Sequence, residues 1–81
     1  MYEYTRTIRD DYGNAYTVHV DKVGGGTVGK RYARENWDVK IANSDGVTVF
    51  DSEGDLYTGA NADHEDAAYI AFDWYVASRD V

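Results

Sequence analysis

Hydrophobic and polar residues alternate along much of the first sixty positions, the period-two pattern of strands with one buried face. The pattern is cleanest over 15–23, where Tyr16, Val18 and Val20 occupy every second position. An earlier run places Tyr2, Tyr4 and Ile8 on one face, with Arg6 interrupting that face. The expected strands are 2–9, 15–23, 32–42, 47–50 and 56–58.

Turn residues separate these segments, although the chain contains no proline. Gly and Asn in 10–14 tolerate positive φ and predict a turn between the first two strands. Asp45-Gly46 is a strong hairpin signal, and 52–55 predicts a further turn. The glycine-rich run Gly24–Gly29 is interpreted as a flexible break between strands.

A helix is expected over 64–78, which is rich in alanine and contains neither Gly nor Pro. Asn61 or Asp63 can serve as its N-cap. At 100° per residue, a polar side forms from Asp66, Tyr69 and Asp73. The opposite, apolar face is expected to contain Ala67, Ala68, Ala71, Phe72, Trp74 and Tyr75. Residues 1–81 therefore predict a single α+β domain, with an antiparallel sheet of four to five strands packed by one C-terminal helix.

Composition indicates how this domain is stabilised and in which compartment it is expected. An 81-residue chain has a thin core, so its eight Tyr, two Trp and two Phe must supply much of the buried surface. Without cysteine it has neither disulfides nor thiolate zinc sites, which fits a reducing compartment. No signal peptide or membrane-spanning run is recognised, so we expect a location in the cytoplasm of a host cell.

The net charge of −7 is unevenly distributed. Residues 1–40 nearly balance seven basic residues against six acidic ones, whereas 41–78 hold eight acidic residues and no Lys or Arg. This half disfavours nucleic acid and anionic lipid as partners and favours a basic protein surface. Two other interpretations stay open, namely a solvated face that confers solubility and adaptation to high salt.

Gly24–Lys30 nearly matches the phosphate-cradling pattern G-x-x-x-x-G-K-[ST], but Arg31 replaces the magnesium-binding hydroxyl. The residue pattern after this run predicts a strand, whereas a P-loop is followed by a helix. A mobile hairpin loop, a partner-binding loop and a small-ligand or nucleotide site remain alternatives for this run.

No catalytic residues and no cofactor are predicted. Asp51, Glu53 and Asp55 have the spacing of the first calcium-loop ligands, yet Leu56 stands where that loop requires glycine. Helical spacing places His64 on the inward side, whereas His19 falls among outward positions, so a His19–His64 metal or acid–base pair has little support.

Exposed tyrosines have two equally supported interpretations. They are typical of binding surfaces, because Tyr buries a large area at little entropic cost, and Tyr is also an amphipathic residue that is common at sheet surfaces. Tyr12, Tyr57 and Tyr69 are expected in a turn, near an edge and on the polar helix face. Aromatics in a basic sheet could instead bind single-stranded nucleic acid, but the neighbouring acids argue against it. The phosphate contacts would then be Arg6, Arg9, Arg31 and Arg34.

The acidic stretch Asp45–Asp66 and the terminal helix Asp63–Ser78 resemble small accessory proteins of phages and other mobile elements, including anti-CRISPR proteins. The resemblance is one of size, charge and architecture over the whole chain. It implies a non-enzymatic viral inhibitor that binds a host protein, in some cases by presenting carboxylates where that protein expects DNA phosphates.

We therefore expect a protein-binding module whose partner is a host protein with a basic surface, such as a nucleic-acid-binding defence complex. Alternatives are a self-assembling structural subunit and the small-ligand site at Gly24–Lys30. The expected partner-binding residues are Asp45, Asp51, Glu53, Asp55, Tyr57, Asp63, Glu65, Asp66 and Tyr69.

Overall fold

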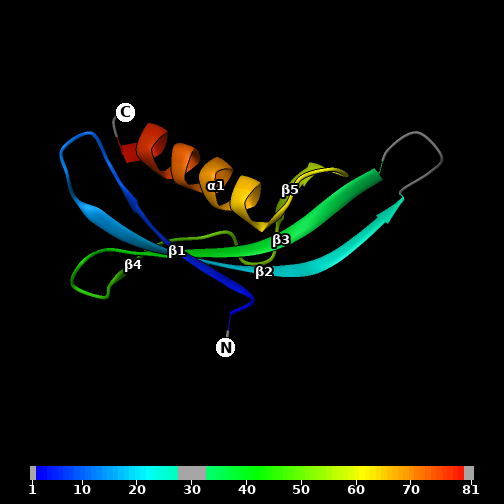
Figure 1. The fold of residues 1–81 in the computed structure, drawn as a ribbon, viewed down its shortest axis with the longest axis horizontal. Helices are drawn as coiled ribbons and strands as arrows, with labels where there is room; N and C mark the ends of the chain where they lie inside the picture. The colour runs from blue at the N-terminus through cyan, green and yellow to red at the C-terminus, as the bar shows by residue number, and fades with distance from the viewer. Residues whose placement is uncertain (1, 28–32, 80–81) are drawn as a thin grey trace.

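The computed structural model describes residues 2–27 and 33–79, which form five strands and a C-terminal helix (Figure 1). The fold class expected from the sequence is thereby confirmed. In chain order the elements are β1 (Tyr4–Arg9), β2 (Ala15–Thr27), β3 (Ala33–Ala42), β4 (Thr48–Asp51), β5 (Leu56–Gly59) and α1 (His64–Arg79). None of the helices described is long and apolar enough to cross a membrane.

The sheet is antiparallel and runs in the order β1-β2-β3-β4, with β5 also paired to β3. One edge of β3 is shared by two short strands. β4 pairs with Lys40–Ala42, and β5 pairs with Arg34–Trp37. The residues that join β4 to β5 therefore run along the middle of β3 without belonging to either strand.

The glycine run does not break the sheet where the sequence predicted. Gly24, Gly25 and Gly26 continue β2 and pair with Asn36, Glu35 and Arg34 of β3. The register shifts between Lys22 and Gly24, where an extra residue forms a bulge. Pairing with β3 thus outweighs the weak strand preference of glycine. The rest of the predicted break falls outside the described residues.

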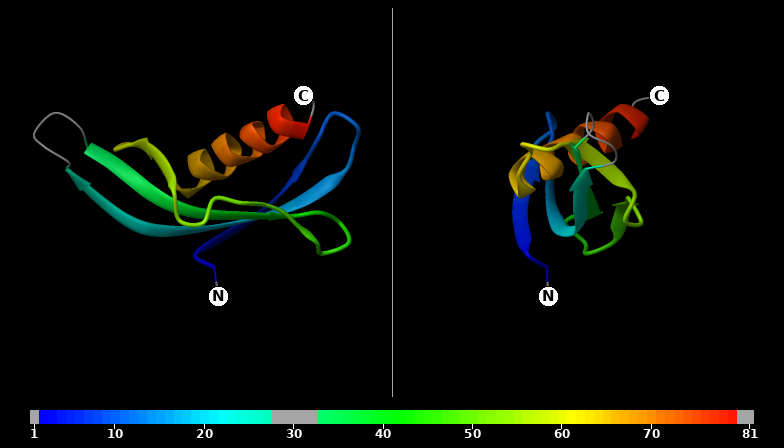
Figure 2. Two further views of the ribbon diagram at one scale, coloured as in Figure 1. Left: turned by 180° about the vertical axis from the view of Figure 1, so that it is seen from behind. Right: turned by 90° about the vertical axis from the view of Figure 1, so that its right-hand side faces the viewer.

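The helix covers one face of the sheet and leaves the other face open (Figure 2). Val18, Val20, Val39 and Ile41 are fully buried beneath it. The helix contributes Ala67, Ala68 and Ala71, also fully buried, together with Phe72. Small alanine side chains let the helix axis approach the sheet closely, which is how so short a chain closes a core.

Trp37 anchors the core at the N-terminal end of the helix. Its side chain is buried, and its indole Nε1 donates a 2.7 Å hydrogen bond to Thr58 Oγ1 of β5. The ring of His64 packs edge-on against the indole, with the ring centroids 4.9 Å apart. His64 therefore lies on the inward side of α1, as helical spacing predicted.

Two aromatic side chains depart from their predicted positions. Trp74 was expected on the apolar helix face, yet 55% of it is exposed. Tyr2 was expected beside Tyr4 and Ile8, but it precedes β1 and stacks on His19, with ring centroids 4.1 Å apart. Because Tyr2 lies before the first strand, the alternation that places Tyr4 and Ile8 does not constrain it.

Candidate partner-binding site

The acids at the start of α1 stabilise the helix itself. Asp63 Oδ1 accepts the backbone N–H of Asp66 at 2.9 Å, and Asp66 Oδ2 accepts the backbone N–H of Asp63 at 3.0 Å. This reciprocal capping box satisfies two N–H groups that the helix cannot satisfy internally. The hydrogen bond from the Asp66 N–H lowers the pKa of Asp63. Of the two N-caps the sequence allowed, the structure uses Asp63.

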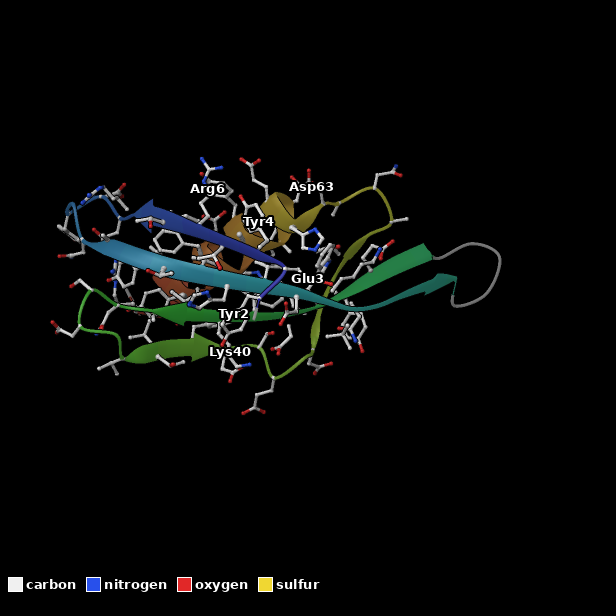
Figure 3. The ribbon with its side chains drawn as sticks, turned by 60° about the horizontal axis from the view of Figure 1, so that its bottom comes forward. Tyr2, Glu3, Tyr4, Arg6, Lys40 and Asp63 are labelled. Atoms are coloured by element: carbon white, nitrogen blue, oxygen red, sulfur yellow. The ribbon has the colours of Figure 1, made fainter. Side chains whose placement is uncertain are left out.

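Arg6 contacts two of the other predicted binding residues. Its Nη1 lies 2.9 Å from Glu65 Oε1, and its guanidinium lies over the ring of Tyr69, 5.3 Å from the centroid. Arg6 interrupts the apolar alternation of β1 because it reaches past the sheet edge to the helix (Figure 3). The pair is substantially exposed, so it contributes little stability.

Asp51–Tyr57, hereafter the edge segment, is held along β3 by backbone and side-chain hydrogen bonds. The Ser52 backbone N–H donates to the Val39 carbonyl at 2.9 Å, and Ser52 Oγ accepts the Val39 N–H at 2.8 Å. Gly54 donates its N–H to Asp38 Oδ1 at 3.2 Å. Ser52 and Asp38 thereby supply bonds that a continuous strand would make through its backbone.

Asp51, Glu53, Asp55 and Tyr57 are exposed, while the residues between them are wholly or partly buried. Asp51 Oδ1 accepts the Glu53 N–H at 2.8 Å, and the Asp55 N–H donates to the Ser52 carbonyl at 3.0 Å. The segment is therefore a hydrogen-bonded turn that exposes three carboxylates and a half-exposed tyrosine.

Asp45 lies apart from this group. It sits in the turn between β3 and β4, at the opposite end of the sheet from β5 (Figure 1). Asn43 Oδ1 closes that turn by accepting the N–H groups of Asp45 and Val47 at 3.0 Å each. The nine predicted binding residues thus fall into three places: four in the edge segment, four at the start of α1, and Asp45 alone. Those at the start of α1 bond the helix or Arg6, so the edge segment is the group whose carboxylates form no ion pair within the described residues.

The two histidines lie on opposite sides of the sheet and cannot form a pair. His19 is hydrogen-bonded to Thr5 Oγ1 at 3.0 Å and stacks on Tyr2. His64 Nε2 lies 3.1 Å from Glu3 Oε1, on the helix side. The same Glu3 oxygen accepts the Lys22 N–H at 2.6 Å, and these two contacts lower the pKa of Glu3. No cluster of metal-binding side chains occurs among residues 2–27 and 33–79.

The strand assignment of the glycine run removes the geometry of a phosphate loop from its first part. Gly24–Gly26 are paired in the sheet, so their N–H groups do not curl around an anion. The chain continues into a strand at Ala33, not a helix. The positions Gly29, Lys30 and Arg31 lie outside the described residues.

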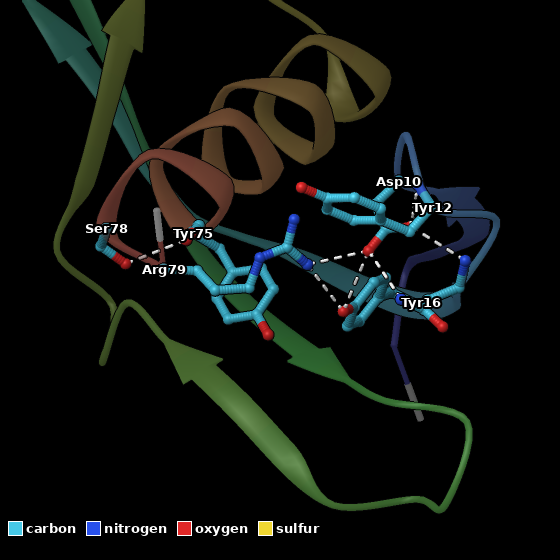
Figure 4. Close-up of polar contacts among 7 residues, drawn as sticks. Asp10, Tyr12, Tyr16, Tyr75, Ser78 and Arg79 are labelled. Atoms are coloured by element: carbon cyan, nitrogen blue, oxygen red, sulfur yellow. Dashed lines mark hydrogen bonds and ion pairs between the residues drawn. The ribbon is translucent and has the colours of Figure 1, made fainter. Parts of the chain in front are cut away.

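A second polar cluster escaped the sequence analysis. Asp10 Oδ2 lies 2.8 Å from Arg79 Nη1, although 69 positions separate the two residues. Asp10 Oδ1 accepts the N–H groups of Tyr12 and Asn14, and Arg79 also donates to Tyr16 Oη at 3.0 Å (Figure 4). We call this arrangement the Asp10–Arg79 lock. It fastens the last turn of α1 to the turn between β1 and β2.

The lock determines the charge state of Asp10, whose side chain is only 1% exposed. Burial by itself would raise the pKa of this carboxyl. The hydrogen bonds from Arg79, Asn14 and Tyr12 outweigh burial and hold the pKa far below its usual range. The sequence signals the local turn through Asp10 and Asn14, but nothing in its spacing indicates the distant Arg79.

Comparison with known proteins adds no further constraint. The chain matches no protein-family model, and no curated protein or solved structure matches it significantly. The functional argument therefore depends on the geometry of this chain alone.

Proposed function

We propose that this chain is a non-enzymatic protein-binding module that presents the edge segment to a basic surface of its partner. Asp51, Glu53 and Asp55 form no ion pair within the described residues, and nearby Lys40 lies 3.2 Å from Asp38 instead. Their charges are therefore directed to solvent. Tyr57 adds half-exposed aromatic area next to them, the kind of side chain that anchors interfaces.

The backbone conformation of Glu53 is the observation that carries this proposal. Its φ is +56°, the only positive φ at a described residue other than glycine. This region costs a residue with a Cβ about 1–2 kcal/mol, and Gly or Asn would occupy it more readily. A charged residue that costs stability at an exposed turn indicates that its carboxylate serves a purpose other than folding.

The partner that fits this surface is a protein with a basic groove. The most specific form of this proposal is that the groove binds nucleic acid. Carboxylates on a bonded turn can occupy positions where such a protein accepts phosphates. Charge complementarity of this kind accelerates encounter and is weakened by salt. This version makes the chain an inhibitor of a host nucleic-acid-binding complex, in line with its likeness to anti-CRISPR proteins.

The test compares three baits in a nuclease-treated lysate of a host cell at low salt, with elution by a salt gradient and mass spectrometry. The baits are the wild type, Glu53→Lys/Asp55→Lys and the single control Asp45→Lys. We expect a basic protein retained by the wild type and the control and lost from the double variant. Capture of the same proteins by all three baits would overturn the proposal.

A second candidate function, self-assembly, is favoured by the free edge of β2. β1 pairs with β2 only as far as Val20, yet β2 continues to Thr27. Beyond Lys22, whose N–H is taken by Glu3, no described residue pairs with this edge. Unpaired edges can add a strand from another chain. Sedimentation velocity over a wide concentration range tests this, since a constant monomer mass would exclude it.

A further inference from the structure

A groove of about 390 Å³ lies between α1 and the end of β1, on the flank of the helix bordered by the β1–β2 turn. Its apolar lining comes from Ile8, Phe72 and Val76. The first two are buried core residues, and Val76 packs against the same core. We call this the helix groove. Its walls are fixed, because the Asp10–Arg79 lock holds the β1–β2 turn against the last turn of α1.

Three carboxylates line the helix groove. That of Asp10 is paired with Arg79, which leaves Asp11 in the β1–β2 turn and Asp73 on the helix. No hydrogen bond or ion pair of either carboxylate occurs within the described part of the chain. Arg9 also lines the groove, but its guanidinium donates to the Gly13 carbonyl at 3.2 Å. Because that carbonyl is neutral, Arg9 keeps its positive charge, and the border carries the two unpaired carboxylates against one guanidinium, beside an apolar floor.

Tyr69 lines the groove as well, and its ring already contacts a guanidinium of the same chain, that of Arg6. This contact shows that the aromatic surface at the groove is compatible with a cation. Long basic side chains combine an aliphatic stem with a charged head, and they bury the stem where apolar surface is offered. An apolar floor, an aromatic ring and free carboxylates together match that amphipathic chemistry.

We propose that the helix groove binds an arginine side chain of the partner, with its methylene stem on the apolar floor and its guanidinium at the carboxylates of Asp11 and Asp73. Arginine fits better than lysine, because a planar guanidinium can stack on tyrosine and bond two carboxylate oxygens at once. The inference rests on the proposed function and adds a second contact, on a different part of the molecule from the edge segment.

An acidic or purely apolar occupant fits less well. An anionic side chain would have only Arg9 to pair with and would be repelled by the carboxylates of Asp11 and Asp73, a repulsion that the low-polarity floor strengthens. An aliphatic side chain would cover Ile8 and Phe72 but leave the bordering charges without a counter-charge. Both remain distinguishable outcomes of the experiment below.

The experiment is an amide NMR titration of the whole chain with the blocked tripeptide Leu-Arg-Leu at millimolar concentration. Blocked Leu-Glu-Leu and Leu-norleucine-Leu serve as the acidic and apolar controls. We expect saturable shifts centred on Asp11, Tyr69 and Val76 with the arginine peptide. Removing both carboxylates in Asp11→Asn/Asp73→Asn should weaken its binding about tenfold, as expected for two charge-assisted contacts. Equal binding of all three peptides would overturn the inference.

A matched variant separates this inference from the proposed function. Asp45→Asn/Glu53→Gln also removes two exposed carboxylates, but neither lines the helix groove. It should bind the arginine peptide like the wild type, and the dispersion of its amide spectrum reports folding for both variants. If the peptide shifts nothing while the Glu53→Lys/Asp55→Lys bait still loses its basic partner, the groove inference fails and the proposed function stands. If the arginine peptide binds while the Glu53→Lys/Asp55→Lys bait keeps its basic partner, the proposed function of the edge segment fails and the groove inference stands.

Discussion

The β1–β2 turn and the edge segment both follow a strand with an acidic turn, yet they use their carboxylates in opposite ways. In the first, Asp10 is buried and receives hydrogen bonds from its own turn and from Arg79. In the second, Ser52 and Asp38 hold the backbone, and the carboxylates of Glu53 and Asp55 face solvent. One turn uses its charge for folding, whereas the other leaves its charge available.

The difference comes from what lies opposite each turn. The last helical turn brings a guanidinium to Asp10, so burial of that carboxylate is compensated. The edge segment lies beside β3, whose Lys40 is already paired with Asp38. That pairing, led by the hydrogen bond to Asp38, raises the pKa of Lys40 and keeps it charged. Asp51 lies opposite Lys40 in the sheet, but the ion pair of Lys40 is with Asp38, and Glu53 and Asp55 form no ion pair within the described residues.

The largest expected effect is on the lock. Asp10→Asn removes the charge that Arg79 faces and one of the acceptors in the turn, so we expect Tm to fall by roughly 10 °C. The neighbouring exposed Asp11→Asn should leave Tm within about 1–2 °C, since its carboxylate has no described partner. Thermal unfolding followed by circular dichroism measures both. Similar decreases of Tm in the two variants would show that the carboxylate of Asp10 stabilises the fold no more than that of Asp11.

The lock also predicts a pH dependence. The pKa of Asp10 is depressed in the folded chain, so its contribution is present above the unfolded carboxyl pKa of about 4 and is lost as pH falls through the lower folded value. The Tm difference between the wild type and Asp10→Asn should therefore shrink as pH is lowered from 7 to 3. A difference that stays constant over this range would mean that the ionised carboxylate is not what stabilises the turn.

Alternation and turn residues predict the strands well where neighbours agree with local preference. The pattern around Val18 and Val20 is confirmed in position and facing, and the helix from His64 is confirmed in position and in the facing of its buried Ala and Phe residues. The prediction was wrong at Gly24–Gly26. Glycine has a low strand propensity, and the local sequence does not show that these residues pair with the distant strand β3. Trp74 was misplaced because a broad helical face does not show which of its positions the sheet covers.

The candidate site was predictable only in part. The sequence predicted the acidic residues from Asp45 to Asp66 as one binding surface, because they are numerous and no Lys or Arg lies among them. In the structure Asp63 and Asp66 cap the helix, which separates them in role from the acidic residues of the edge segment. Ser52 carried no signal at all, because its function depends on Val39 lying opposite it. Contacts between residues distant in sequence decide which charges are free, and a single sequence does not contain them.

A middle-sized effect is expected from the bond that holds the edge segment. Ser52→Ala leaves the Val39 N–H, in a fully buried residue, without its acceptor, at a cost of about 1–2 kcal/mol. Hydrogen exchange at Val39 should accelerate more than exchange at Val20, which lies in the neighbouring strand. The matched control is Ser44→Ala, in the exposed β3–β4 turn, which should change neither quantity. Unchanged protection of Val39 in Ser52→Ala would contradict the role given to the hydroxyl.

The smallest effect on stability, and the sharpest division between the two turns, is expected at Glu53. Asparagine tolerates φ near +56° better than glutamate, so Glu53→Asn should raise the unfolding free energy by up to about 0.5–1 kcal/mol. The same change removes a displayed carboxylate and should weaken partner binding. Stability and binding then move in opposite directions at Glu53, whereas no such gain in stability is expected from replacing Asp10. Urea unfolding combined with the bait comparison measures the two quantities, and a Glu53→Asn variant that is more stable and binds equally well would show that the strained glutamate has no role in recognition.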